Sequence, residues 1–460
     1  MVIESRNPVT GELLASFEEL LPEEVEKRLA ISRAAFEAHH TTSFAHRAEK
    51  LRKVAAILEA ECRTFAGLMT AEMGKTITAS LAEVAKSARG CRFYADGGAA
   101  MLADEMVDSP TGRAFVRYQP IGPVLAVMPW NFPFWQVIRF AAPALMAGNV
   151  CLLKHASNVP QCALALEEIF RRAGFDQGEF QTLLIGSEAT GPVIDDPRVR
   201  AVTLTGSTAA GRSVAARAGG AIKKTVLELG GSDPFIVTAN CDFEKTVAAA
   251  VASRTVNNGQ SCIAAKRFLV EDAIYERFTT SFVAALEKLR VGDPMDERTQ
   301  LGPLATAAIR DEVEDQVRRA VDGGARLLTG GTRLPGPGNY FPPTAIDRIP
   351  PGNPARVEEI FGPVASIIRF HTLEEAITLA NETAFGLGSS VWTLDEEEQR
   401  RFIDGIEAGM VFVNAIVASD PPLPFGGVKE SGYGRELGSW GIREFVNVKA
   451  VWVDQAGGSR

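Results

Sequence analysis

Short apolar runs alternate with amphipathic helical patterns from residue 122 onward, and this alternation restricts the possible folds more than any other feature. A helical pattern at 161–173, closed by Gly174, separates the second run from the third. Strands that alternate with helices form parallel sheets with right-handed crossovers, so we expect a doubly wound α/β fold. The runs that we interpret as buried strands are 124–128, 150–153, 182–185 and 201–204.

Two other regions extend this picture. Residues 21–105 carry apolar residues at three- and four-residue steps, as in Leu51, Val54 and Leu58, and this period predicts helices. The region 231–430 shows the same alternation of short apolar runs and helical patterns, and this alternation predicts a second α/β unit. Its expected elements are a helix at 243–254, strands at 268–270 and 411–413, and a Gly/Pro-rich loop at 329–343.

Two segments outside these regions alternate apolar and polar residues and predict further strands. They lie at 115–120 and at 445–453, and we expect them to pair with each other. Exposed strands promote association with other chains unless they are covered. We therefore expect residues 105–120 with 440–460 to form a small β-element between the subunits of a homodimer or a homotetramer.

Composition excludes several classes of function. The chain has 48 Lys and Arg against 57 Asp and Glu, a net charge of -9, and no basic run that would favour nucleic-acid binding. The weakly charged stretch 132–153 contains Arg139 and two prolines, so we interpret it as buried core and not as a membrane span. Six cysteines without paired spacing, and an N-terminus without a signal pattern, indicate the cytoplasm. Five histidines without zinc-ligand spacing predict no metal site.

Three polar segments follow or interrupt apolar runs and supply a thiol, a carboxylate and an amide. A thiol that attacks a carbonyl needs a lowered pKa or a nearby base, and a donor for the oxyanion that forms. We interpret Cys262 as the nucleophile, Glu228 as the base, and Asn131 with the Cys262 N–H as the oxyanion donors. Taken alone, each signal is weak, because a lone cysteine is usually a core thiol. The segments are 129–133 (PWNFP), 227–231 (LELGG) and 258–262 (NGQSC).

Together these segments resemble the aldehyde dehydrogenase superfamily, and the resemblance covers essentially the whole chain. The resemblance implies that Cys262 attacks an aldehyde, that hydride passes to NAD(P)⁺, and that water activated by Glu228 hydrolyses the thioester. We then expect a cofactor-binding domain of 1–104 and 121–230 and a catalytic domain of 231–430. The other matching motifs are 7–12 (NPVTGE), 361–364 (FGPV) and 424–432 (PFGGVKESG).

Cofactor contacts depend more on this resemblance than on pattern. The turn 205–211 follows a strand and opens a helix, so its N–H groups can hold a pyrophosphate, although an ordinary strand–helix turn has the same pattern. Ser157 stands where strictly NAD-dependent members carry glutamate, which repels a 2′-phosphate, so we expect NADP⁺ to be usable. The residues to which the resemblance assigns NAD(P) contacts are Trp130, Lys154, Ser157, Gly206, Ser207, Glu359 and Phe361.

Within the superfamily, the chain looks most like bacterial succinate-semialdehyde dehydrogenases. Those enzymes bind a substrate carboxylate with arginine and serine, which implies that Arg139 and Ser419 bind a distal carboxylate here. An internal salt bridge is the alternative for Arg139, and the second arginine of some members is Val256 in this chain. Trp130 and Phe425 are expected to line the aldehyde tunnel, with plain core packing as the alternative, and Phe132 and Trp135 are expected to contact the substrate.

Three other functions stay open at the level of sequence. The chain could oxidise another small or aliphatic aldehyde. It could also be an acylating enzyme that passes the thioester to coenzyme A, but such enzymes do not need a water-activating carboxylate, and Glu228 argues against this. Finally, it could be a binding or structural protein on an inherited scaffold. The intact Cys262, Glu228 and Asn131 argue against that function.

Overall fold

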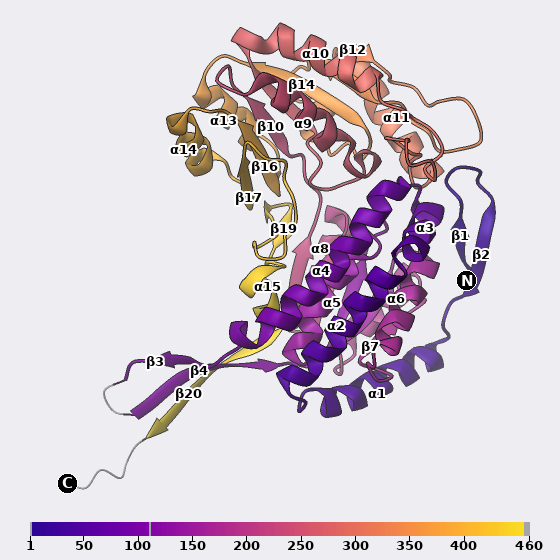
Figure 1. Ribbon diagram of the computed structural model, residues 1–460, viewed down its shortest axis with the longest axis vertical. Coiled ribbons are helices and arrows are strands. Elements are labelled where there is room, and N and C mark those ends of the chain that lie inside the picture. The colour runs from indigo at the N-terminus through magenta and orange to yellow at the C-terminus, as the bar shows by residue number, and fades with distance from the viewer. Residues whose placement is uncertain (1, 110–111, 455–460) are drawn as a thin grey trace.

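The apolar runs after residue 122 form a parallel sheet in the computed structural model, which describes residues 2–109 and 112–454 (Figure 1). Its strand order is β19-β9-β8-β5-β6-β7, and β19 alone runs antiparallel to its neighbour. We call it the first sheet. Its strands are β5 Pro123–Met128, β6 Val150–His155, β7 Phe180–Thr182, β8 Ala201–Thr205, β9 Lys224–Glu228 and β19 Gly432–Tyr433.

The prediction for β7 was wrong in its position along the chain. The strand ends at Thr182, whereas the apolar pattern placed it at 182–185. The N–H of Leu183 still donates to the Leu153 carbonyl of β6 at 2.7 Å, but the chain then leaves the sheet, and the carbonyl of Leu184 accepts the N–H of Leu20 at 2.8 Å. Leu183 and Ile185 are buried in the core beyond the end of the strand, so their apolar character reports burial.

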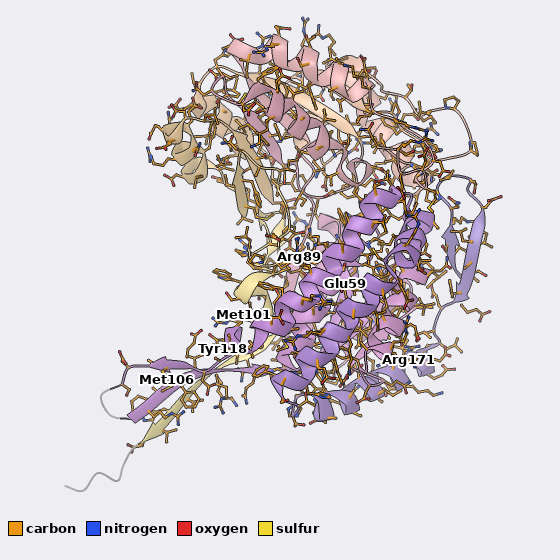
Figure 2. All side chains as sticks on the ribbon, in the orientation of Figure 1. Glu59, Arg89, Met101, Met106, Tyr118 and Arg171 are labelled. Carbon is orange, nitrogen blue, oxygen red and sulfur yellow. The ribbon has the colours of Figure 1, made fainter. Side chains whose placement is uncertain are left out.

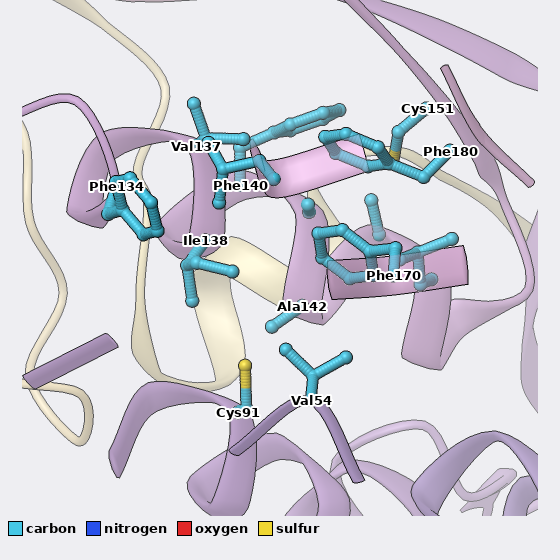
Figure 3. Close-up of a cluster of buried hydrophobic side chains, with 14 of the residues drawn as sticks. Val54, Cys91, Phe134, Val137, Ile138, Phe140, Ala142, Cys151, Phe170 and Phe180 are labelled. Carbon is cyan, nitrogen blue, oxygen red and sulfur yellow. The ribbon is translucent and has the colours of Figure 1, made fainter. Parts of the chain in front are cut away.

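Helices cover both faces of the first sheet. One face packs against α2, α4, α5 and α6, and Figure 3 shows Val54 of α2, Cys91 of α4 and Phe170 of α6 around this core. The predicted helix at 161–173 is α6, and Gly174 follows it with a φ of +91° as a closing residue requires. The helices of this region are α1 Pro22–His39, α2 Phe44–Ala60, α3 Cys62–Met73, α4 Ile77–Met101, α5 Trp135–Ala147, α6 Pro160–Arg172, α7 Ser187–Asp195 and α8 Thr208–Gly220.

The region after residue 231 forms a second sheet, with strand order β12-β13-β14-β11-β10-β16-β17. The helix predicted at 243–254 and the strands predicted at 268–270 and 411–413 are confirmed. The strands are β10 Pro234–Val237, β11 Arg267–Glu271, β12 Arg326–Thr329, β13 Thr344–Asp347, β14 Val364–Phe370, β16 Gly388–Trp392 and β17 Met410–Val413. The helices are α9 Phe243–Thr255, α10 Tyr275–Glu287, α11 Ala307–Asp322, α12 Pro354–Val357, α13 Leu373–Asn381 and α14 Glu396–Gly405.

A third sheet projects from the body of the molecule (Figure 1), and we call it the projecting sheet. In it, β20 Val446–Asp454 pairs antiparallel with β4 Gly112–Pro120 along its whole length, which confirms the predicted pairing. The strand β3 Glu105–Val107 pairs with the other edge of β4. Met106 and Tyr118, labelled in Figure 2, mark this sheet. The final part of the predicted β-element, residues 455–460, lies outside the described residues.

Short elements complete the described chain. Within it, none of the helices combines the length and the apolar character that crossing a membrane requires. The remaining elements are β1 Val2–Arg6, β2 Leu13–Glu18, β15 Phe385–Gly386, β18 Val428–Lys429, α15 Gly438–Arg443 and the 3₁₀ helices η1 Val256–Gly259 and η2 Asp272–Ile274.

Candidate active site

The carboxyl ends of β5, β8 and β9 meet at one edge of the first sheet, where parallel sheets usually place ligands. A cleft of about 270 Å³ opens there, close to the lower end of the range of about 300–1,000 Å³ that is usual for small-molecule sites. The turn before Cys262, which lies between α9 and β11 of the second α/β unit, brings this residue to the cleft. The predicted residues that line this cleft are Trp130, Asn131, Gly206, Ser207, Cys262, Glu359 and Phe361.

The backbone before Cys262 is held in an uncommon conformation. Asn257 and Asn258 have φ values of 55° and 59°, a region that residues with side chains rarely adopt. Gly259 follows, and a Cβ there would collide with the backbone of Gly362. The Asn258 amide donates to the carbonyls of Gly74 at 2.9 Å and Pro303 at 3.0 Å. These contacts fix the position of the thiol before any substrate binds.

Lys266 stabilises the same turn from the other side. Its Nζ donates to the carbonyls of Ser261 at 2.8 Å and Cys262 at 2.5 Å, and it pairs with Glu359 at 3.2 Å. Glu359 in turn accepts the N–H of Gly231 at 3.0 Å. Lys266 could not be predicted from the sequence, because a single lysine four residues after Cys262 carries no distinctive pattern.

Asn131 is oriented by hydrogen bonds at each of its polar groups. Its Nδ2 donates to the Gln260 carbonyl at 3.1 Å, and its Oδ1 accepts from Gln136 at 3.1 Å. Its own carbonyl accepts from Asn257 at 2.7 Å. A primary amide has two N–H groups, so one N–H of Asn131 remains free. It can donate to the oxygen of an aldehyde whose carbon is bonded to Cys262. The geometry therefore fits the predicted oxyanion donor.

The thiol of Cys262 is not activated by its resting surroundings. Burial raises its pKa to about 12, and the nearby cations Lys266 and Arg139 offset this only in part. A thiol that attacks a carbonyl needs either a lowered pKa or a nearby base. Because the pKa of Cys262 is raised, its attack depends on a group that accepts the thiol proton.

Glu228 ends β9 and is buried. In the described part of the chain, neither of its carboxylate oxygens has a hydrogen-bond partner. Burial raises its pKa well above the ordinary value, Glu436 raises it further, and Arg139 lowers it. A buried carboxyl with a raised pKa and free oxygens is suited to accept a proton from water. It lies against Gly426, toward the Arg139–Glu436 pair.

Arg139 forms an internal salt bridge, which was the alternative to a contact with the substrate carboxylate. Its guanidinium forms an ion pair with Glu436, and both side chains are buried. The same guanidinium lies 4.4 Å from the centre of the Phe425 ring and donates to Thr205 at 3.4 Å. Its charge is thus compensated inside the protein, so the structure favours the internal salt bridge over direct capture of a substrate carboxylate.

Arg139→Ala is therefore expected to destabilise the protein by about 3–5 kcal/mol, because it leaves a buried Glu436 without its counter-ion. Thermal unfolding measures this loss, and oxidation of charged and neutral aldehydes should fall by equal factors. The double variant Arg139→Met with Glu436→Gln is the control, since it removes both charges and should recover most of the stability. A stable Arg139→Ala protein that loses activity only toward carboxylated aldehydes would contradict the salt-bridge assignment.

The phosphate turn has the form that a dinucleotide requires. Gly206 and Ser207 follow β8, which ends at Thr205, and α8 begins at Thr208 directly after these two cleft residues. Ser207 caps the helix by accepting the N–H of Ala210 at 3.3 Å. A Cβ on Gly206 would meet only Leu204, so the space above this turn is open. These features fit a bound pyrophosphate.

Lys154 lies near the end of β6, the strand beside β5, and Ser157 follows this strand; neither residue lines the cleft. Ser157 is exposed and Lys154 is half-buried. Between them, His155 is buried and bonds the Pro133 carbonyl at 2.9 Å, and burial lowers its pKa to about 4. This neutral imidazole connects the turn after β6 to the loop that carries Asn131. Lys154 and Ser157 are thus placed at the sheet edge that continues from the cleft.

An apolar cluster adjoins Cys262. Phe132 and Cys262 pack against it, and its buried members include Trp135 and Phe425. The Trp135 indole N–H donates to Ser419 Oγ at 2.8 Å. The structure therefore brings together the aromatic residues and the serine that were predicted to contact substrate. Among the described residues, His, Cys, Asp and Glu side chains form no group suited to a metal ion.

Comparison with known proteins agrees with this geometry. The profile of the Aldehyde dehydrogenase family matches residues 1–451. The chain belongs to the aldehyde dehydrogenase family. Similar curated proteins include succinate-semialdehyde dehydrogenase [NADP(+)] 1 of Mycobacterium ulcerans, 56% identical over 98% of this chain and 100% of that protein. A probable succinate-semialdehyde dehydrogenase [NADP(+)] of Synechocystis is 53% identical, again over 98% and 100%.

Solved aldehyde dehydrogenase structures share the fold. The succinic semialdehyde dehydrogenase of Streptococcus pyogenes, crystallised with NADP⁺ as the cofactor, matches with a TM-score of 0.97 and 37% identity, over 98% of this chain and 100% of that chain. A succinate-semialdehyde dehydrogenase of Burkholderia pseudomallei matches with a TM-score of 0.96 and 34% identity, over 99% and 95%. The expected doubly wound aldehyde dehydrogenase fold is thereby confirmed.

Proposed function

We propose that this aldehyde dehydrogenase oxidises succinate semialdehyde to succinate with NADP⁺ and water. The observation that carries the reaction type is the thiol of Cys262 beside the oriented amide of Asn131 in one cleft. The substrate and cofactor are supported by relatives at 53% to 56% identity over nearly their full length, whose names specify succinate semialdehyde and NADP⁺.

In the proposed mechanism, the Cys262 thiol gives its proton to water in the cleft as Sγ bonds to the aldehyde carbon, and the aldehyde oxygen accepts from Asn131 Nδ2–H and the Cys262 N–H. When bound, NADP⁺ supplies the hydride acceptor that converts this adduct to a thioester. Glu228 then takes a proton from water, the water oxygen attacks the thioester carbon, and the Cys262 sulfur leaves. Glu359 and Lys266 keep the walls of the cleft in place throughout.

We propose that the pyrophosphate of the cofactor binds to Gly206, Ser207 and the N-terminus of α8. The adenosine ribose and its 2′-phosphate bind to Lys154 and Ser157. Glu359 binds the nicotinamide ribose, and Phe361 packs on the ring. Phe361 already lies edge-on to Trp130, with 5.8 Å between the ring centres.

Ser157→Glu is expected to raise the KM for NADP⁺ by about 10-fold or more, because a carboxylate repels the 2′-phosphate. The KM for NAD⁺ should change by less than about 3-fold, since NAD⁺ lacks that phosphate. Steady-state assays with both cofactors measure the two constants, and Ser157→Ala controls for loss of the hydroxyl. Equal effects on both cofactors would show that Ser157 does not face the adenosine ribose.

A panel of aldehydes assayed with NAD⁺ and NADP⁺ tests the proposed function. We expect succinate semialdehyde with NADP⁺ to give the highest kcat/KM. A higher kcat/KM for an uncharged aldehyde would overturn the proposed substrate. A strict requirement for coenzyme A would show that the thioester is transferred to coenzyme A and not hydrolysed by water.

We also propose that the projecting sheet joins subunits in a homodimer or a homotetramer. Its strands carry exposed large apolar residues, which are seldom left in water on a projecting ribbon. Burying them against a second copy would remove this surface from water. The residues concerned are Met106, Val107, Val448, Trp452 and Val453.

A further inference from the structure

Gln136 is a buried amide on the first turn of α5, and it lines the cleft beside Asn131. The start of this helix is fixed, because the N–H groups of residues 134 and 135 donate to the Glu83 carboxylate at 2.9 Å and 3.0 Å. Glu83 is itself buried and pairs with the buried Lys75. Gln136 is therefore carried on a firmly held element, next to the amide that stabilises the oxyanion in the proposed mechanism.

The atoms on the two sides of the Asn131 amide decide its orientation. The Gln260 carbonyl lies 3.1 Å from Nδ2, and a carbonyl can only accept, so Nδ2 must be on that side. Oδ1 then faces Gln136 and requires a donor, which is Gln136 Nε2 at 3.1 Å. If the Asn131 amide were rotated by 180°, oxygen would face oxygen at Gln260 and N–H would face N–H at Gln136. The two glutamines thus exclude the orientation in which Asn131 would turn its oxygen toward the substrate oxygen.

Gln136 keeps this position although its amide is only partly satisfied. Within residues 2–109 and 112–454, its Oε1 has no hydrogen-bond partner, and this oxygen is buried. A buried amide oxygen without a partner destabilises the folded state, whereas an apolar side chain of the same length has no such group. Every residue of α5 is buried, so an apolar side chain at position 136 would suit its surroundings. Stability alone therefore favours an apolar residue at this position.

We propose that Gln136 is a positioning residue for the reaction, because its Nε2–H holds the Asn131 amide with the free Nδ2–H toward the substrate oxygen. The inference rests on the proposed function and deepens it. Gln136 contacts none of the reacting atoms and acts only through Asn131. Its loss should weaken the stabilisation of the oxyanion twice, when the thiol adds to the aldehyde and again when water adds to the thioester.

The test compares Gln136→Met with wild type, since methionine keeps the length of the side chain but cannot donate to Asn131. Gln136→Met should lower both the rate constant of the NADPH burst and kcat by about 10- to 100-fold, because a displaced donor loses much of its effect. A fluorescence titration should give an unchanged Kd for NADP⁺. The variant also removes the unpaired Oε1, which offsets the lost hydrogen bond, so the Tm should stay within about 2 °C of the wild-type value.

A double-mutant cycle separates action through Asn131 from a general disturbance of the cleft. Asn131→Ala removes the amide that Gln136 holds, so adding Gln136→Met to it should lower kcat no further. The matched control is Gln181→Met. Gln181 is also buried, but it lies on β7, where its Nε2 donates to the Arg28 carbonyl at 2.8 Å and to Ser32 Oγ at 2.7 Å. This variant should lower the Tm and leave kcat unchanged.

The outcomes keep this inference distinct from the proposed function. If wild type prefers another aldehyde, the proposed substrate fails, and the same comparison with that aldehyde still tests Gln136. If Gln136→Met keeps the wild-type kcat, the assignment of Gln136 fails and the proposed function stands. A Tm lowered by many degrees would show that the amide supports the fold, and an equal loss of kcat in the wild-type and Asn131→Ala backgrounds would show that it does not act through Asn131. Either result would overturn the inference.

Discussion

Cys262→Ala is expected to abolish aldehyde oxidation, with a loss of about 10⁴-fold or more in kcat. Covalent attachment precedes hydride transfer in the proposed mechanism, and the neighbouring residues 260, 261, 263 and 264 offer no other thiol. The turn around position 262 is held through the backbone and through Asn258 and Lys266, so the fold and the cofactor cleft should persist. Steady-state assays, a fluorescence titration with NADP⁺ and a thermal melt measure the three properties.

The control for this variant is Cys62→Ala, because Cys62 is also half-buried but lies on α3, away from the cleft. It should keep wild-type turnover. A Cys262→Ala enzyme that retains a tenth of the wild-type rate would show that the reaction does not proceed through a thioester on this residue.

Glu228→Gln is expected to lower the steady-state rate by about 100-fold or more, because an amide cannot take a proton from water. Adduct formation and hydride transfer do not use this carboxyl in the proposed mechanism. The first turnover should therefore still give a burst of NADPH equal to the number of active sites. Rapid-mixing absorbance measures the burst and the steady-state rate in one trace, and Glu188→Gln, on the first turn of α7, serves as the control.

The raised pKa of Glu228 gives this prediction a pH dependence. Burial and Glu436 favour the protonated carboxyl, and only the ionised form accepts a proton from water. Hydrolysis of the thioester in wild type should thus accelerate as pH rises through the raised pKa of Glu228, because the ionised fraction of this carboxyl grows there. The acceleration should be absent from Glu228→Gln. A profile that is the same in both proteins would mean that another group activates the water.

The architecture was largely accessible from sequence, because it follows from local period and from strand ends. The runs at 124–128 and 201–204 form β5 and β8, and the residues after them line the cleft as expected for parallel strands. The pairing of 445–453 with 115–120 followed from alternation alone. The error at β7 arose because Leu183 and Ile185 are buried without belonging to the strand, and an apolar run does not distinguish these cases.

The charge pairing around the site could not be predicted from sequence. Arg139 and Glu436 are almost 300 residues apart in the chain, and no local pattern relates them. The raised pKa of Cys262 likewise depends on burial by distant segments. Motifs predict the reacting groups, whereas tertiary packing decides which charges are already neutralised.

The most direct test of the proposed reaction is a product balance with purified enzyme, succinate semialdehyde and NADP⁺ in the absence of coenzyme A. NADPH is read by absorbance and succinate by chromatography. Hydrolysis of a thioester on Cys262 predicts one succinate for each NADPH, through many turnovers. NADPH that stops after a single turnover until coenzyme A is added, or NADPH formed without succinate, would contradict it.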